Sequence, residues 1–166
     1  MKWMLGALGL LGLAAASHAE DLQFDIRYTT ECLARADDLP AQRVCIGAAS
    51  VACMEATPAG YSTFGMRGCS NFELEWWDGE LNAAYQELRA IEKTEDQEMA
   101  DLPGVESQAD ALRNMQRAWI ALRDAKCLYE RAQWGGGTGG GPAYVSCALH
   151  ETAEQTLYLQ SMAMEW

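Results

Sequence analysis

The chain has 166 residues, of which 24 are acidic and 12 are basic, so its formal net charge is −12 at pH 7. This charge argues against binding to nucleic acid or to anionic lipid headgroups, and it favours a cationic partner. The alternative is that the charge only keeps the protein soluble. The length suits a single small domain with a modest core.

The N-terminal segment has the layout of a secretory signal peptide. One lysine precedes a short apolar run, and Ser17-His18-Ala19 closes the segment with small residues. We therefore expect residues 1–19 to be removed after Ala19. The run is shorter than the roughly 20 apolar residues of a spanning helix, which argues against an uncleaved anchor. The mature chain, residues 20–166, would keep 11 basic residues and a net charge of −13. This predicts a periplasmic or secreted protein without a membrane span after cleavage.

The remaining sequence predicts an all-α fold, a small disulfide-stapled bundle of antiparallel helices. Apolar residues recur at three- and four-residue steps, and prolines and glycines separate the periodic segments. The expected elements are a helical hairpin within residues 20–52 with helices at 24–36 and 41–54, two long central helices at 67–92 and 105–134, and a C-terminal helix at 143–164. Residues 53–166 would form the main helical domain, with the hairpin as an N-terminal extension.

The second long helix is expected to be central. Its residues Leu112, Met115, Trp119 and Leu122 form an apolar stripe, and Gln116, Trp119, Arg123 and Cys127 form a second, polar stripe. A tryptophan shared by two stripes predicts a helix that packs on two sides.

The mature chain contains six cysteines, an even number that indicates disulfides in an oxidising compartment. Pairing of sequence neighbours is favoured because each pair brackets a turn or loop; the pairs are Cys32 with Cys45, Cys53 with Cys69, and Cys127 with Cys147. A zinc site does not fit, because no two cysteines have only two to four residues between them and His150 is the one mature histidine. A redox motif does not fit either, because the chain has no Cys-x-x-Cys. We predict no metal and no cofactor.

Arg123 requires an explanation if its stripe is buried, because a buried arginine needs a carboxylate partner. The candidate partners on the neighbouring helix are Glu73, Asp78 and Glu80. We expect a structural polar network that sets the register of the two long helices, made of Asp78, Asn82, Tyr85, Gln116 and Arg123.

A glycine-rich segment separates the last two helices and is the candidate partner-binding loop: Trp134, Gly135, Gly136, Gly137, Thr138, Gly139, Gly140 and Gly141. It lacks the lysine and the preceding strand of a phosphate-binding loop. Glycines give the backbone freedom to approach a partner closely, and a Cys127–Cys147 bond would position the loop. The alternative is a bare linker.

No catalytic arrangement is recognisable, so we predict a protein that is not an enzyme. His150 has no nucleophile at a fixed spacing, and no pair of facing carboxylates can be identified. Trp76, Trp77 and Trp119 fall at helical spacing, which favours a place in the core over a sugar-binding platform.

Two motifs resemble the lysozyme inhibitor LprI-like N-terminal domain family over about residues 53–160. They are Asp78-x-x-Leu81-Asn82-x-x-Tyr85 and Gln116-Arg117-Ala118-Trp119-x-x-x-Arg123-Asp124-x-x-Cys127, followed by the glycine tract and Cys147. The resemblance implies an exported, helical, disulfide-bonded bacterial protein and points to lysozyme inhibition. This chain differs from the family by its N-terminal hairpin and by Glu154-Gln155-Thr156, where the family tends to have a threonine–arginine pair.

The resulting hypothesis is an exported binding protein that inhibits a cationic, lysozyme-like muramidase by acidic-surface and loop contacts. The alternative is a non-catalytic structural or envelope-associated protein.

Overall fold

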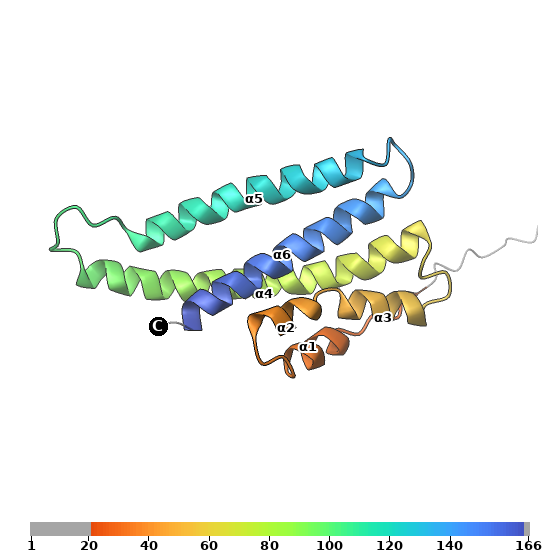
Figure 1. The fold of residues 1–166 in the computed structure, drawn as a ribbon, viewed down its shortest axis with the longest axis horizontal. Helices are drawn as coiled ribbons and strands as arrows, with labels where there is room; N and C mark the ends of the chain where they lie inside the picture. Colours follow the sequence, from red (N-terminus) through yellow and green to blue (C-terminus); the bar gives the residue numbers. More distant parts are fainter. Residues whose placement is uncertain (1–20, 165–166) are drawn as a thin grey trace, which may run out of the picture.

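The computed structural model describes residues 21–164, which form six α-helices and no strands (Figure 1). The predicted signal peptide lies outside the described residues. The helices are α1 (Arg27–Leu33), α2 (Leu39–Val44), α3 (Ala48–Ala56), α4 (Thr63–Glu98), α5 (Gln108–Ala132) and α6 (Gly140–Met164). The predicted all-α, disulfide-stapled bundle is confirmed.

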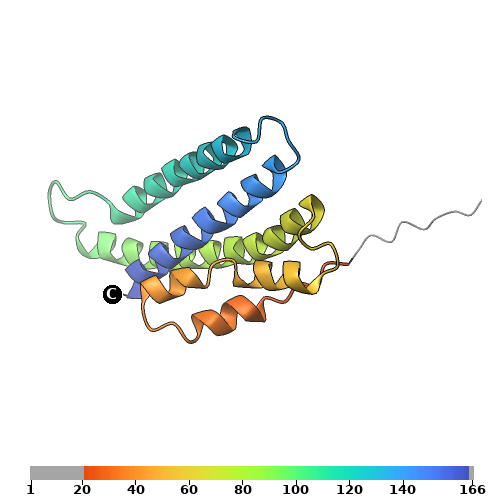
Figure 2. The same cartoon turned by 45° about the vertical axis from the view of Figure 1, so that its right-hand side comes forward.

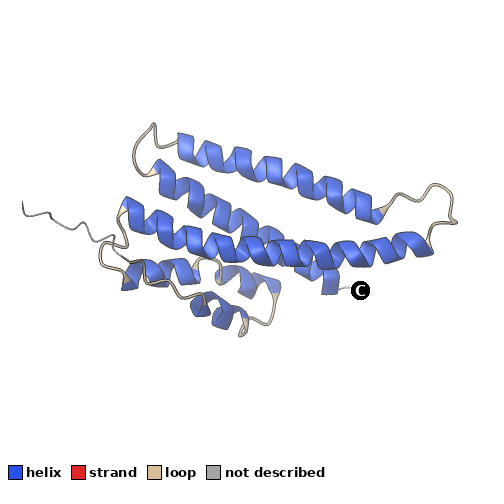
Figure 3. Ribbon diagram, turned by 180° about the vertical axis from the view of Figure 1, so that it is seen from behind, coloured by secondary structure: helices blue, strands red, loops and turns tan. Residues whose placement is uncertain are grey.

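Helix α4 is the spine of the bundle. The short helices α1, α2 and α3 lie on one side of α4, and α5 lies on the other (Figures 1 and 2). Helix α6 begins beside the end of α5, contacts both α4 and α5, and crosses α4 diagonally to reach α2 (Figures 1 and 3). Two apolar clusters fill the contacts; one contains Leu81, Ala84, Leu88, Leu112 and Leu159, and the other Trp77, Leu149, Ala153 and Leu157.

Helix α6 is more buried than α5, although α5 was expected to be the central helix. Ten residues of α6 are buried, whereas α5 buries Ala109, Leu112, Gln116 and Cys127. Leu122, which we placed on the apolar stripe, is 65% exposed. Helix α5 therefore packs on one side and leaves its outer face open to solvent.

The predicted helix over residues 41–54 is interrupted, and this expectation was wrong. It forms α2 and α3, separated at Gly47, whose φ of +90° lies in the left-handed region that glycine adopts without a steric cost. Pro40 lies in the first turn of α2, where a proline is tolerated, and Asp38 caps this helix by accepting a hydrogen bond from the Ala41 amide at 2.8 Å.

Side-chain caps define the starts of both long helices. Ser62 caps α4 by accepting a hydrogen bond from the Gly65 amide at 3.1 Å. Ser107 caps α5, and Asp96 of α4 supports that cap by accepting hydrogen bonds from the Ser107 hydroxyl at 2.6 Å and the Gln108 amide at 2.7 Å. The Ser107 hydrogen bond is the main cause that lowers the pKa of Asp96. The ionised Asp96 therefore stabilises the fold at any pH above the pKa that Asp96 has in the unfolded chain. This stabilisation is lost as the pH falls through the lowered pKa of the folded chain.

The pKa of Glu92 is shifted in the opposite direction from that of Asp96, so its effect on stability has the opposite dependence on pH. Burial, followed by repulsion from Asp96 and Glu95, raises its pKa, and its Oε2 atom is buried without a protein partner. The folded chain then binds this proton more tightly than the unfolded chain, so stability falls as the pH rises from about 4.5 through the raised pKa.

We expect Glu92→Gln to raise the free energy of unfolding at pH 7 by about 0.5–2 kcal/mol. Single substitutions that remove an unfavourable charge commonly stabilise proteins by this amount. Urea denaturation at pH 7 and pH 4 measures the effect, and Glu87→Gln on the exposed side of α4 is the control. An equal effect at both pH values would contradict this explanation, because the raised pKa of Glu92 favours its uncharged form at the lower pH.

Three disulfides connect the helices, and each joins cysteines that are neighbours in the sequence. Cys32–Cys45 links α1 to the residue after α2, Cys53–Cys69 links α3 to α4, and Cys127–Cys147 links α5 to α6. The last of these holds together the two helices on either side of the glycine tract. No helix within residues 21–164 combines the length and apolarity needed to cross a membrane.

Candidate functional site

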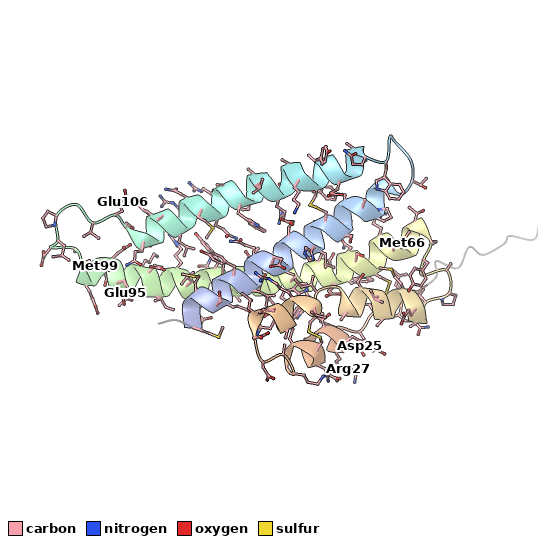
Figure 4. The ribbon with its side chains drawn as sticks, in the orientation of Figure 1. Asp25, Arg27, Met66, Glu95, Met99 and Glu106 are labelled. Atoms are coloured by element: carbon pink, nitrogen blue, oxygen red, sulfur yellow. A yellow bond between two sulfur atoms is a disulfide. The ribbon has the colours of Figure 1, made fainter. Side chains whose placement is uncertain are left out.

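All five residues of the predicted polar network line one cleft of about 440 Å³ between α4 and α5. Helix α4 contributes three of them and α5 contributes two; they are Asp78, Asn82, Tyr85, Gln116 and Arg123. In Figure 4, side chains of both helices extend into the space between the two ribbons. The topology therefore brings these residues to one place.

The side chains of this set do not form a connected network across the helices. Asn82 donates hydrogen bonds to the carbonyl oxygen and carboxylate of Asp78, at 2.7 and 3.2 Å, within α4. Gln116 is buried and accepts a hydrogen bond from the Gln155 amide of α6 at 3.0 Å. The polar groups consequently remain turned toward the cleft or toward α6.

Arg123 does not pair with the neighbouring helix, so this expectation was wrong. Its guanidinium contacts Asp124 of its own helix at 2.8 Å and lies over the Trp119 ring, 5.1 Å from the ring centroid. Among residues 21–164, no salt bridge joins Arg123 to Glu73, Asp78 or Glu80. The side chain is 21% exposed, and the open cleft supplies the solvent that a fully buried arginine would lack.

Glu73 instead forms a separate buried cluster on the opposite side of α4. The residue is fully buried. Its Oε1 accepts hydrogen bonds from the Thr29 hydroxyl at 2.9 Å, the Gly47 amide at 2.9 Å and the Trp77 indole at 3.2 Å, and its Oε2 accepts one from the Ser50 amide at 2.7 Å. No cation among the described residues pairs with it. Four donors from α1, α3, α4 and the α2–α3 turn thus converge on one carboxylate.

A signal for this cluster is present in the sequence. Cys69, Glu73 and Trp77 follow one another at four-residue steps, so a carboxylate stands at a core-facing position between two buried residues. That pattern indicates a buried acid with its own donors. Glu73 therefore faces α1 and α3 and not Arg123, for which it was a candidate partner.

The glycine tract is shorter as a loop than we expected, because Gly140 and Gly141 are the first residues of α6. Gly135 and Gly136 have φ values of +55° and +84°, which require glycine. A side chain at Gly139 would collide with the Trp134 ring. The backbone of the loop at Gly139 therefore packs against the ring of Trp134, and this tryptophan remains 55% exposed.

Negative charge is concentrated at the other end of α5. Residues 92–110, which we call the acidic turn, contain seven acidic residues and one lysine. Figure 4 labels Glu95, Met99 and Glu106 at this end of the bundle. The segment between Cys127 and Cys147 contains only Glu130 and Arg131 as charged residues. Helix α5, which connects the acidic turn to the glycine loop, has 25 residues and is therefore about 37 Å long.

A family model described as "Lysozyme inhibitor LprI" matches residues 53–159. The chain belongs to the LprI lysozyme inhibitor family. Eight positions of the two LprI motifs line the cleft between α4 and α5, namely Asp78, Leu81, Asn82, Tyr85, Gln116, Arg117, Trp119 and Arg123. The residues of the two motifs therefore line one cleft in three dimensions rather than two separate helix faces.

Two curated relatives are similar to this LprI-family chain. An uncharacterized 17.7 kDa protein of Rhodobacter capsulatus, encoded in the puhA 5′ region, is 29% identical over 146 residues, covering 81% of this chain and 84% of the relative. An uncharacterized protein of Rhizobium meliloti strain 1021 is 28% identical over 95 residues, covering 57% of this chain and 68% of the relative. No solved structure matches the chain. Because residues 53–166 make up less than 81% of the chain, the first similarity extends into the N-terminal segment.

The residues by which the chain departs from the LprI pattern have defined contacts. Glu154 forms a salt bridge with Arg43 at 2.8 Å and so connects α6 to α2. Gln155 is buried and bonds Gln116. His150 is exposed, with Glu154 at 3.9 Å as its ionic neighbour. Within residues 21–164, no three metal-ligating side chains gather into a group that could hold an ion.

Proposed function

We propose that this protein is an exported binding protein that inhibits a cationic, lysozyme-like muramidase and acts without catalysis. The observation that carries the proposal is the match of the lysozyme inhibitor family over residues 53–159. The disulfides support a periplasmic or secreted location, because such bonds persist in oxidising compartments. The negative charge would attract a cationic enzyme.

The partner would lie along the outer face of α5. The acidic turn leads into this helix, and Trp134 of the glycine loop follows two residues after its end. Between them, Leu122 and Tyr129 are each 65% exposed, seven residues apart on one face. An apolar face with an acidic region at one end and an aromatic residue at the other suits a standard interface of roughly 800 Å² per partner.

The acidic turn and the apolar face would act on different steps of binding. Charges at the edge of an interface mainly change the association rate and its dependence on salt. Exposed aromatic and aliphatic side chains that become buried mainly change the dissociation rate. The two contributions can therefore be separated by variants.

A lytic assay with a purified cationic lysozyme tests the proposal. We expect inhibition at micromolar concentrations of the protein. The triple variant Glu98→Gln, Asp101→Asn, Glu106→Gln removes three exposed charges of the acidic turn. It should weaken inhibition about tenfold at low salt and by much less at moderate salt. The control Asp21→Asn, Asp37→Asn, Glu55→Gln makes the same change in net charge at the N-terminal helices and should have an effect of less than about twofold.

The variant Trp134→Ala, together with Leu122→Ala and Tyr129→Ala, should weaken inhibition at both salt concentrations. If the acidic-turn variant and its control lose the same amount of inhibition, the proposal that the partner binds at the acidic turn is wrong. No inhibition by the unaltered protein, at micromolar excess and at both low and moderate salt, would overturn the inhibitor function for that enzyme. It would favour a structural role in the cell envelope.

A further inference from the structure

A cluster of arginines lines the cleft between α4 and α5. Four of the chain's 12 basic residues meet there, although the protein as a whole is strongly acidic: Arg89 from α4, and Arg113, Arg117 and Arg123 from α5. Asp78 is the one carboxylate that lines the cleft with them. Like charges gathered in this way repel one another, so the arrangement requires a compensating group.

Only two of the four arginines form an ion pair with an acid of the described residues. Arg113 pairs with Asp110 at 3.0 Å and Arg123 pairs with Asp124 at 2.8 Å, each within α5. Arg89 and Arg117 form no ion pair with any acid among residues 21–164. The Nε atoms of Arg89 and Arg113 are buried and have no protein acceptor. Buried donors of this kind are costly unless an acceptor reaches them.

The geometry points to a binding site for a small organic oxyanion, a ligand with carboxylate or phosphate groups. Guanidinium groups present paired N–H donors that match the oxygens of these groups. Arg113 and Arg123 are ten residues apart along α5, about 15 Å, so the site suits a ligand with more than one anionic group. Tyr85 and Trp119 provide flat surfaces beside the arginines, and about 440 Å³ falls within the range of small-molecule pockets.

The net charge of the protein restricts the size of the ligand. A chain with a formal charge of −12 repels polyanions at long range, and this repulsion opposes binding of nucleic acids. A small anion that enters the cleft is held at short range by the guanidinium groups nearest to it, where their field outweighs that of distant carboxylates. The site is distinct from the outer face of α5, so it goes beyond muramidase inhibition.

Thermal denaturation and calorimetric titration of the purified protein test this site, with inorganic phosphate and citrate as probes and with chloride and a neutral sugar as references at matched ionic strength. We expect phosphate or citrate to raise Tm and to bind with a measurable Kd, whereas chloride and the sugar do neither. Preference for citrate would identify a carboxylate ligand, and preference for phosphate a phosphorylated one.

The double variant Arg89→Gln, Arg117→Gln removes the two arginines without an acidic partner and should weaken binding at least about tenfold. The control Arg27→Gln, Arg35→Gln removes the same charge from α1 and should keep the affinity within about twofold. If the cleft variant simply fails to fold, its far-ultraviolet circular dichroism will show this. Arg117→Gln alone, on an exposed residue, then provides the test and should weaken binding severalfold.

Tryptophan fluorescence gives a second readout, because an anion that draws Arg123 away from Trp119 changes the surroundings of that ring. Trp119→Phe should remove the fluorescence response to the anion while the thermal response remains. Equal binding by the cleft variant and the α1 control, or the same rise in Tm with chloride, would show an adventitious ion only and would overturn the proposal. Muramidase inhibition is measured separately, so either proposal can fail without the other.

Discussion

Replacing Glu73 by alanine should lower the free energy of unfolding by about 4 kcal/mol or more, the largest effect expected of any single substitution in this protein. The substitution removes the acceptor of four hydrogen bonds and leaves their donors buried, on Thr29, Gly47, Ser50 and Trp77. Each buried donor without a partner costs about 1–3 kcal/mol. The empty volume of the deleted side chain adds to this loss.

The conservative variant Glu73→Gln separates lost hydrogen bonding from lost volume. Its amide oxygen can still accept from Thr29, Gly47 and Trp77, but its NH2 group would face the Ser50 amide, where the carboxylate now accepts at 2.7 Å. We therefore expect a smaller loss than with alanine, but one above about 1 kcal/mol. Urea denaturation followed by circular dichroism measures both variants.

Glu87→Ala, on the exposed side of the same helix, is the matched control and should change stability by less than about 0.5 kcal/mol. A loss no larger for Glu73→Ala than for this control would show that the buried carboxylate does not stabilise the fold. Tryptophan fluorescence should also respond to Glu73→Ala, because the Trp77 indole loses its acceptor.

Loss of the Cys127–Cys147 disulfide should have the second-largest effect. The bond closes a segment with a sequence separation of 20 between α5 and α6. In the chain-entropy model, such a closure stabilises the folded chain by about 3 kcal/mol. The double variant Cys127→Ala, Cys147→Ala should lose about this amount, and limited proteolysis should then cut the glycine loop near Gly136.

The double variant Cys32→Ala, Cys45→Ala removes a bond of sequence separation 13 and provides the comparison. It should cost a similar amount but leave the glycine loop resistant to protease, because this bond lies on the other side of α4. Cleavage of the loop at the same rate in both variants would mean that the Cys127–Cys147 bond does not position the loop.

The elements that were predictable are those in which several local signals agree. In α4 and α5, helical periodicity and the proline–glycine corner between the two helices indicate both elements, and the expected ranges 67–92 and 105–134 differ from the observed bounds by two to six residues at each end. The disulfide pairing was also predictable, since each cysteine pair brackets one turn. Periodicity and turn residues act over short stretches of chain, so they can be recognised without knowledge of the packing.

The features that were not predictable depend on how the helices are rotated against one another. Gly47 could continue a helix or end one, and its left-handed conformation follows from the need to direct its amide toward Glu73. Helical periodicity places Glu73 of α4 and Arg123 of α5 each on an inward-facing stripe of its own helix. It does not show that the two stripes face different neighbours in the folded chain. The arginine cleft was missed for the same reason, because Arg89 and Arg113 come together only through the crossing of α4 and α5.

The Glu73 cluster also bears on how this chain should be divided. The family match begins at residue 53, inside α3, but Thr29, Gly47 and Ser50 lie before that point and complete the shell of a carboxylate that lies after it. A fragment that starts at residue 53 would expose this carboxylate and the surface of α4 that α1 and α3 cover. The segment that the family model matches is thus smaller than the segment that contributes to the Glu73 cluster. In this chain, residues before the family boundary form part of the interior.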